Sequence, residues 1–499
     1  MITLAYSRLA KTAGGFLTAL LLTACGYSGN EDRASVTVIE ETAPAIKPVG
    51  TRLNYISATA RAAVAKGLVG FDEEGRVVPA IAARWIVTDD GLSYIFRLHD
   101  GKWNDGRQIT AERVAKLLQE RIKELENSRL RYDLRAIEEI VSMTGRVIEI
   151  RLNAPHPNFL QLMAQPELGL FRAGHGAGPM DDLMMNGIYA LVPFEQSGEE
   201  AEIETENEPV DDPRRVAMRA DNAAKAIARF QAGQTDLVLN GKFHHLPLLD
   251  AADIDTNDLR LDPVAGLFGF LFVKVEGFWA VPKNREILAM AINRPALLTS
   301  FPQVTGWQSR QKIIPEALDV EGINTRPDWA GMTMEARQQF AREHVQRWKA
   351  SEGPIKPLTV QLPDAAGADI LFLRVRTDLR RVGLDLRKAG NGATADARLI
   401  DSIAPYDSPQ WFLSQLTCAK TPVCLNDADA KLKEADAATN LQIKARLYAE
   451  AEKILVYHYN YIPLGVPVRW SLAKPAQRGF AVNPRGWHPL NYLVGVPIS

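Results

Sequence analysis

The residue types that carry most enzyme chemistry occur in this 499-residue sequence without the spacings of known catalytic motifs. There is no Gly-x-Ser-x-Gly, no His-Glu-x-x-His and no Gly-x-x-x-x-Gly-Lys, the patterns of serine hydrolases, zinc proteases and phosphate-binding loops. The 60 acidic residues are scattered along the chain. We therefore expect that the protein is not an enzyme. A secreted hydrolase is the alternative from another functional class, and turnover of a chromogenic ester, glycoside or peptide would support it.

Histidines at two places in the sequence could act as metal ligands. His244 and His245 are adjacent, so their side chains point apart on a strand and 100° apart on a helix, and no cysteine or acidic cluster lies at ligand spacing. His156 stands between two prolines, which is typical of a turn. The sequence therefore predicts no metal site and no cofactor.

The first 24 residues have the features of a bacterial signal peptide. Arg8 and Lys11 precede a short apolar run that ends in Leu-Thr-Ala-Cys25, which resembles a lipobox. About 13 apolar residues span roughly 20 Å as a helix, too short for a bilayer core of roughly 30 Å. We predict cleavage after residue 24, lipidation of Cys25 and a flexible tether over 25–35. Ordinary secretion with a free or disulfide-bonded Cys25 is the alternative.

The other two cysteines, Cys418 and Cys424, enclose the seven-residue segment CAKTPVC. Two thiolates without a nearby histidine make a poor zinc site. Secretion permits a disulfide, and closing so small a ring would stabilise the fold by about 2.4 kcal/mol. We expect this disulfide to stiffen a local loop.

Charge and hydropathy restrict the partners. Loss of residues 1–24 would leave 56 of the 58 basic residues and all 60 acidic residues. A slight acidic excess does not favour nucleic acid as a partner. No later run approaches 18 apolar residues, so we expect no membrane-spanning segment after the signal peptide.

The most distinctive local pattern lies between residues 67 and 110. A turn at 87–91 is followed by Tyr94, Phe96 and Leu98 at alternate positions, as in a half-buried antiparallel hairpin. Thr110 can then cap a helix whose apolar residues share one face.

This stretch resembles the extracytoplasmic solute-binding proteins of oligopeptide, dipeptide and nickel ABC importers. The resemblance is carried by Gly67-Leu68-Val69, Asp72, Gly75, Pro79-Ala80-Ile81-Ala82, Trp85, Asp90-Gly91, Tyr94, Phe96-Arg97-Leu98, Trp103, Asp105-Gly106 and Thr110-Ala111-Glu112. A second match is the helix expected over 282–292, where Asn293-Arg294 stands in place of the family's Asp-Arg. Elsewhere the resemblance is looser. Dipeptide-binding members carry a cystine near the position of Cys418 and Cys424.

The resemblance implies an α/β, two-lobed periplasmic-binding-protein fold, class II-like with an extra N-terminal subdomain and a ligand cleft between the lobes. The strand, helix and strand expected over 215–239, and again over 358–387, agree with two α/β lobes. We assign 36–50, 166–262 and 463–499 to lobe I, 51–165 to the extra subdomain and 263–462 to lobe II.

The resemblance also suggests the ligand site. In peptide carriers of this family an aspartate in lobe II, near a Pro-x-x-Phe and before the cystine, pairs with the peptide α-ammonium. Asp407 is the nearest candidate, displaced by about one position, and Asp401 is the second. Tyr406 and Trp411 are candidates for a side-chain pocket, with lobe core as the alternative. Arg398 and Arg469 are candidates for a ligand carboxylate.

The implied function is the substrate-binding component of an ABC importer. It would capture a small solute, above all short peptides, by hinge closure and deliver it to the permease. The alternatives are a non-peptide solute such as a sugar, opine or metal chelate, and a sensor or murein-peptide carrier without its own transporter. We expect a monomer that is lipid-anchored at the periplasmic face of a bacterial membrane or at the cell surface.

Overall fold

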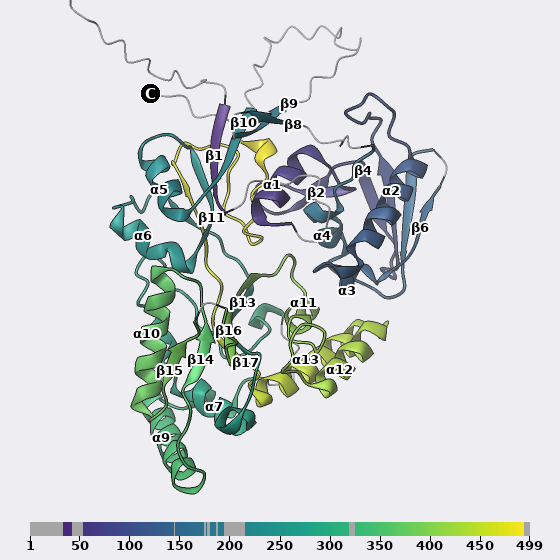
Figure 1. Ribbon diagram of the computed structural model, residues 1–499. Helices are drawn as coiled ribbons and strands as arrows, with labels where there is room; N and C mark the ends of the chain where they lie inside the picture. Colours follow the sequence, from purple (N-terminus) through teal and green to yellow (C-terminus); the bar gives the residue numbers. More distant parts are fainter. Residues whose placement is uncertain are drawn as a thin grey trace, which may run out of the picture.

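The computed structural model describes residues 33–41, 53–143, 145–173, 176, 180–185, 188–193, 215–318, 325–390 and 392–493. The expected signal peptide, the lipidation site Cys25 and most of the expected tether lie outside these residues. The described chain forms two lobes, with the extra subdomain beside the first (Figure 1). Among the described residues, no helix combines the length and the apolar character needed to cross a bilayer.

Lobe I is built on a seven-stranded sheet in the order β12-β18-β11-β1-β10-β9-β8. Its strands are β1 (Arg33–Ile39), β8 (Met180–Met185), β9 (Ile188–Pro193), β10 (Arg215–Asp221), β11 (Leu237–Lys242), β12 (Leu259–Leu261) and β18 (Arg469–Ala473). The predicted β-helix-β unit consists of β10, α5 (Ala223–Gln231) and β11, and both strands run parallel to β1 between them. Asn222 caps α5, and η3 (Phe243–His245) and α6 (Leu246–Ala251) follow β11.

The extra subdomain contains a four-stranded antiparallel sheet in the order β4-β5-β7-β6. Its elements are β2 (Val69–Phe71), β3 (Val77–Pro79), β4 (Ala82–Val87), β5 (Ser93–Leu98), α2 (Ala111–Glu124), α3 (Arg131–Leu134), β6 (Ile137–Ser142), β7 (Val147–Leu152) and α4 (Phe159–Met163). The predicted hairpin is β4 and β5, in which Tyr94, Phe96 and Leu98 face the core. Thr110 caps α2 as expected, since its hydroxyl accepts from the Arg113 N–H at 3.3 Å.

Lobe II has a five-stranded sheet in the order β15-β14-β16-β13-β17. Its strands are β13 (Gly266–Phe272), β14 (Leu358–Gln361), β15 (Leu386–Lys388), β16 (Ala397–Ile403) and β17 (Tyr461–Gly465). Its helices are α7 (Pro282–Ala291), α8 (Arg294–Leu298), α9 (Met334–Ser351), α10 (Ala366–Arg381), α11 (Pro409–Ser414), α12 (Asn426–Ala437) and α13 (Leu441–His458). The predicted unit over 358–387 is β14, α10 and β15, with the two strands parallel.

The chain crosses between the lobes twice among the described residues, at 262–265 and at 466–468. The crossings are bonded to each other, because the Asp262 N–H donates to the Arg469 carbonyl at 3.0 Å. The Asp262 carboxylate also accepts from the Asn483 N–H at 3.0 Å and lies 3.2 Å from His488 Nε2. The C-terminal tail is thus fixed to the hinge.

Three boundaries differ from those assigned from the sequence. Strand β1 begins at Arg33, three residues before the expected start of lobe I. Helix α1 (Tyr55–Val64) belongs to lobe I and not to the extra subdomain, because Ile56, Ala60 and Val64 pack in one cluster with the sheet residues of β1, β10 and β11. Strand β17 continues to Gly465 and pairs with β13, so lobe II extends past residue 462.

Candidate ligand-binding site

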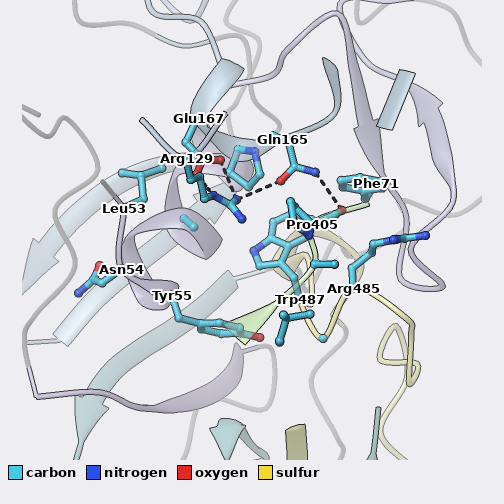
Figure 2. A pocket seen from close by; sticks show the side chains of 15 residues that line it. Leu53, Asn54, Tyr55, Phe71, Arg129, Gln165, Glu167, Pro405, Arg485 and Trp487 are labelled. Atoms are coloured by element: carbon cyan, nitrogen blue, oxygen red, sulfur yellow. Dashed lines mark hydrogen bonds and ion pairs between the residues drawn. The ribbon is translucent and has the colours of Figure 1, made fainter. Parts of the chain in front are cut away.

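A cavity of about 240 Å³ lies where lobe I, the extra subdomain and lobe II meet (Figure 2). Its walls combine the N-terminal turn of α1, the loop after α4, the segment after β16 and the C-terminal tail. The lining residues are Leu53, Asn54, Tyr55, Ala58, Phe71, Arg129, Gln165, Pro166, Glu167, Ile403, Ala404, Pro405, Arg485, Gly486 and Trp487. Its volume is a little below the 300–1,000 Å³ typical of pockets for drug-sized ligands, so it suits a small solute.

The loop over residues 165–170 forms one rigid wall because three arginines hold it. Arg61 donates to the carbonyls of Pro166 at 3.1 Å and Gly169 at 2.7 Å. Arg121 donates to the Glu167 carbonyl at 2.6 Å. Burial, and then the neighbouring Arg121 charge, lower the pKa of Arg61 to about 9. These arginines supply the loop carbonyls with hydrogen-bond donors that water would otherwise have to supply.

The third arginine, Arg129, binds the side chains of this loop. Its Nε lies 2.7 Å from one Glu167 oxygen, and its Nη2 donates to the other at 3.2 Å and to Gln165 Oε1 at 3.0 Å. Burial is the largest single effect on Arg129 and acts to lower its pKa, but the charge and hydrogen bond of Glu167, together with Tyr406, raise the pKa above its usual value. Burial is also the largest single effect on Glu167 and acts to raise its pKa, but the charge and hydrogen bond of Arg129, a backbone hydrogen bond and the Arg121 charge together lower it. Both groups are therefore charged, and each stabilises the charged form of the other.

Lobe II closes the opposite wall with the last residue of β16, Ile403, and the next two residues, Ala404 and Pro405. Pro405 contributes its carbonyl, which accepts from Gln165 Nε2 at 3.3 Å, so one glutamine links Arg129 to the other lobe (Figure 2). Asn158 also donates to the Asp407 carbonyl at 2.5 Å. These bonds place the segment that follows β16 against the extra subdomain.

The C-terminal tail supplies the remaining wall. Gly486 has φ of +55°, and a Cβ there would lie 2.9 Å from Val264 and 3.0 Å from Ile403, so the turn requires glycine. On either side of this glycine, Arg485 and Trp487 line the cavity, and the guanidinium of Arg485 points outward to Asp407 (Figure 2). The Trp487 carbonyl accepts from the buried Asn483 side chain at 3.0 Å, which fixes the turn to the hinge.

Asp407, the first candidate for the ammonium site, forms a salt bridge between the lobes. Its oxygens accept from Arg485 Nη2 at 2.6 Å and Nη1 at 3.2 Å, a bidentate pair. Asp407 does not line the cavity, but Arg485 and Pro405 beside it do. Its side chain remains 45% exposed. The expected residue thus lies at the edge of the cavity and already has a cationic partner.

Asp401 and Arg469, expected separately as ligand residues, are paired with each other. Arg469 Nη1 lies 2.7 Å from the Asp401 carboxylate, and both side chains are almost fully buried. Asp401 lies on β16 of lobe II and Arg469 begins β18 of lobe I, so the pair spans the second crossing. This position gives them a structural role at the hinge.

Tyr406 and Trp411 lie in packed cores, which was the alternative to a ligand pocket. Tyr406 inserts from lobe II into the core of the extra subdomain, where its hydroxyl donates to Asp133. Asp133 also lies 3.1 Å from Nε2 of His156, which is buried and is more than a simple turn residue. Trp411 packs in the lobe II core. Arg398 is exposed on β16 and does not line the cavity.

The remaining cysteines and histidines have structural settings. Cys418 and Cys424 form the expected disulfide in a lobe II loop that is not part of the cavity wall. His244 and His245 lie edge to face next to the crossing, with 4.1 Å between ring centroids and 68° between the ring planes. In the described part of the chain, no three His, Cys, Asp or Glu side chains come together as a metal site.

None of the ligand residues predicted from the sequence lines this cavity, and Tyr406 and Asp407 come nearest to it, directly after Pro405 of the lobe II wall. Arg129, Glu167, Arg485 and Trp487 lie far apart in the sequence and match no motif. One sequence feature could have indicated the C-terminal wall of the cavity. It is the Arg-Gly-Trp segment at 485–487, where an arginine and a tryptophan flank a glycine.

Comparison with known proteins agrees with this architecture. The family model described as bacterial extracellular solute-binding proteins, family 5 Middle, matches residues 76–322. This chain belongs to that family. The family 5 protein described here therefore binds a solute outside the cytoplasm as part of an ABC importer, which confirms the family and the general function predicted from the sequence.

Individual relatives are distant but match over most of their length. The murein peptide-binding protein MppA of Escherichia coli K12 is 24% identical over 469 residues, covering 84% of this chain and 85% of MppA. The probable deoxycholate-binding protein YgiS of the same organism is 22% identical over 487 residues, covering 85% and 86%. Haemophilus influenzae OppA, in complex with the peptide RPPGFSPFR, has a TM-score of 0.73 at 16% identity and covers 93% of this chain and 99% of its own. The two-lobed fold is thereby confirmed.

Proposed function

We propose that this family 5 protein captures a short peptide in the cavity between its lobes and delivers it to the permease of an ABC importer. The observation that carries this proposal is the cavity itself, whose walls come from both lobes and from the extra subdomain. A ligand held there contacts both lobes at once, so it stabilises the closed arrangement over an open one. No chemistry on the solute is required, and we propose a monomeric binding protein without catalytic activity.

The size of the cavity favours a peptide of about two residues over longer ones. Its walls offer what such a ligand needs, namely an apolar surface from Phe71, Pro405 and Trp487 and charged groups at the edge. Among the relatives, MppA is a murein peptide-binding protein, which supports a peptide ligand. YgiS is described as deoxycholate-binding, so a non-peptide solute is the second candidate.

We propose that Asp407 pairs with the α-ammonium of the peptide. A carboxylate has about four acceptor sites, and Arg485 occupies one on each oxygen. The exposed part of Asp407 leaves room for a second cation. Asp401 is a matched control, because its carboxylate is buried in the hinge with Arg469.

Calorimetry tests this assignment on protein that has been denatured and refolded to remove carried-over ligand. Wild type should bind a pool of di- to pentapeptides, with dipeptides tightest, and Asp407→Asn should remain folded and bind at least 10-fold more weakly. Asp401→Asn should lower the free energy of unfolding by about 3 kcal/mol, because Arg469 is left as a buried charge without its partner. If wild type binds no peptide, the peptide proposal fails. If Asp407→Asn binds as tightly as wild type, only the ammonium role fails.

We also propose that Cys25 carries a lipid anchor. Acyl chains on the first residue of the mature protein would hold the lobes at a membrane surface close to the permease. Cys25→Ser should move the protein from the membrane fraction to the soluble fraction with an unchanged dissociation constant. Equal fractionation of the variant and wild type would contradict the anchor.

A further inference from the structure

We propose that Arg129 binds a carboxylate of the solute, so that the cavity selects small ligands that carry a free carboxylate. This inference rests on the proposed function, since it assumes that the cavity is the solute site. It concerns a residue of the extra subdomain that no sequence motif singled out.

Arg129 has hydrogen-bonding capacity left over. A guanidinium has five N–H donors. The bonds to Glu167 and Gln165 use Nε and Nη2, and no described residue accepts from Nη1. The bonds to Glu167 and Gln165 fix the orientation of the guanidinium, and the two remaining N–H groups, both on Nη1, can donate to a carboxylate oxygen.

The Arg129 guanidinium faces the cavity. Arg61 and Arg121 hold the same loop but are only 3% and 9% exposed. The Arg129 side chain is 44% exposed and lines the cavity. Figure 2 shows its guanidinium directed toward Trp487 and Pro405 in the middle of the cavity. The buried Arg61 and Arg121 hold the backbone of the loop, and Arg129, which holds its side chains, is the one of these three arginines that also lines the cavity.

The other charged groups of the described walls are already occupied. Both oxygens of Glu167 accept from Arg129. Arg485 is turned toward Asp407, and its side chain is only 7% exposed. Among the lining residues that the structure describes, Arg129 is thus the accessible charged group, and an anionic ligand group complements its positive charge. A peptide C-terminus is one source of that group, and a small non-peptide acid is another.

The test compares free acids with their amides by calorimetry on refolded protein. The probes are a dipeptide pool, the same pool with C-terminal amides, a panel of small non-peptide mono- and dicarboxylates, and the amides of that panel. The variant is Arg129→Gln with Glu167→Gln, since removing Arg129 alone would leave a buried carboxylate unpaired. The matched control is Arg146→Gln with Asp100→Asn, a surface pair of the same subdomain whose arginine is also 44% exposed. Thermal unfolding and circular dichroism verify that each variant is folded.

We expect wild type and the control to bind the free acid about 10–100-fold more tightly than the amide, and the Arg129 variant to lose this ratio. Arg129→Lys, which keeps the charge without the fork, should retain part of it. Equal affinity of wild type for dipeptides and their amides would overturn this inference and leave the proposed function standing. If only the non-peptide acids bind, with the same dependence on Arg129, the peptide ligand is wrong and the inference holds. If no probe binds, both are wrong.

Discussion

At the scale of single residues, the tyrosine that precedes Asp407 fixes the segment that closes the cavity. Tyr406 is fully buried and joins lobe II to Asp133 of the extra subdomain, which also contacts His156. Burial, and then the Asp133 charge, raise the pKa of Tyr406 well above its usual value, so the hydroxyl remains a donor. The position of Pro405 in the cavity wall depends on this bond.

Tyr406→Phe should lower the free energy of unfolding by about 1–3 kcal/mol, because a buried carboxylate loses a hydrogen bond that nothing replaces. Urea denaturation measures this loss. Tyr448→Phe is the matched control, since Tyr448 is buried in lobe II and makes no hydrogen bond to the described residues. Equal stability of the two variants would contradict the role given to Tyr406.

The two histidines beside the crossing should make the protein sensitive to acid. Burial is the main cause that lowers the pKa of His244 to about 4 and of His245 to about 3. The unfolded chain, with a histidine pKa of about 6.5, then binds more protons than the folded chain, so the free energy of unfolding falls as the pH drops through 6.5 toward 4.

Urea midpoints between about pH 7 and pH 5 measure this dependence. The variant His244→Gln with His245→Gln should show a shallower decline than wild type. Parallel curves for the two proteins would show that these imidazoles do not cause the decline. His99→Gln, at an exposed position of the extra subdomain, controls for loss of an imidazole.

The sequence led only to the neighbourhood of the lobe II wall of the cavity, and none of the predicted residues lines the cavity. The resemblance led to the segment that contains Asp407, because a proline and a phenylalanine at fixed offsets mark it. It also led to Asp401 and Arg469, whose mutual pairing is a tertiary contact between residues 68 positions apart. Arg129 could not have been identified, since one arginine among many has no local signal for facing a cavity.

At the scale of elements, local sequence patterns were sufficient to predict an element where turn residues lie next to a regular alternation of apolar and polar residues. The β4–β5 hairpin, the cap of α2 and both β-helix-β units lie where the sequence predicts them. Strand β16 was not predicted, because Ala397–Ile403 mixes buried and exposed positions without a regular alternation. Helix α1 was assigned to the wrong unit, because its small buried residues do not indicate which sheet they pack on.

The disulfide belongs to this scale because it closes a single loop of lobe II. Replacing Cys418 and Cys424 by serine should lower the free energy of unfolding by about 2 kcal/mol. The dissociation constant for peptide should be unchanged, because the loop contacts lobe II through bonds such as Thr421 Oγ1 to the Phe272 carbonyl and is not part of the cavity wall. Urea denaturation and calorimetry of the same variant measure both quantities. Weaker binding with unchanged stability would contradict this assignment.

At the scale of the whole molecule, the cavity exists only because three separate parts of the chain meet. The hinge is stiffened by the buried Asp401–Arg469 pair, and the lobes are joined at the cavity edge by the Asp407–Arg485 pair, in which only the carboxylate is exposed. Water can solvate the Asp407 carboxylate when its pair opens but cannot reach the buried Asp401–Arg469 pair, so opening should proceed at the cavity edge while the hinge stays intact. The sequence resemblance predicted two lobes and a hinge. The contacts that govern closure join residues far apart in the sequence, so only the folded structure identifies them.

The most direct measurement of solute capture by closure is small-angle scattering of the refolded, ligand-free protein before and after addition of the tightest-binding dipeptide. The expected result is a smaller radius of gyration at saturation, reached at the concentration at which calorimetry shows the site to be filled. An unchanged radius of gyration with the site filled would contradict closure around the solute.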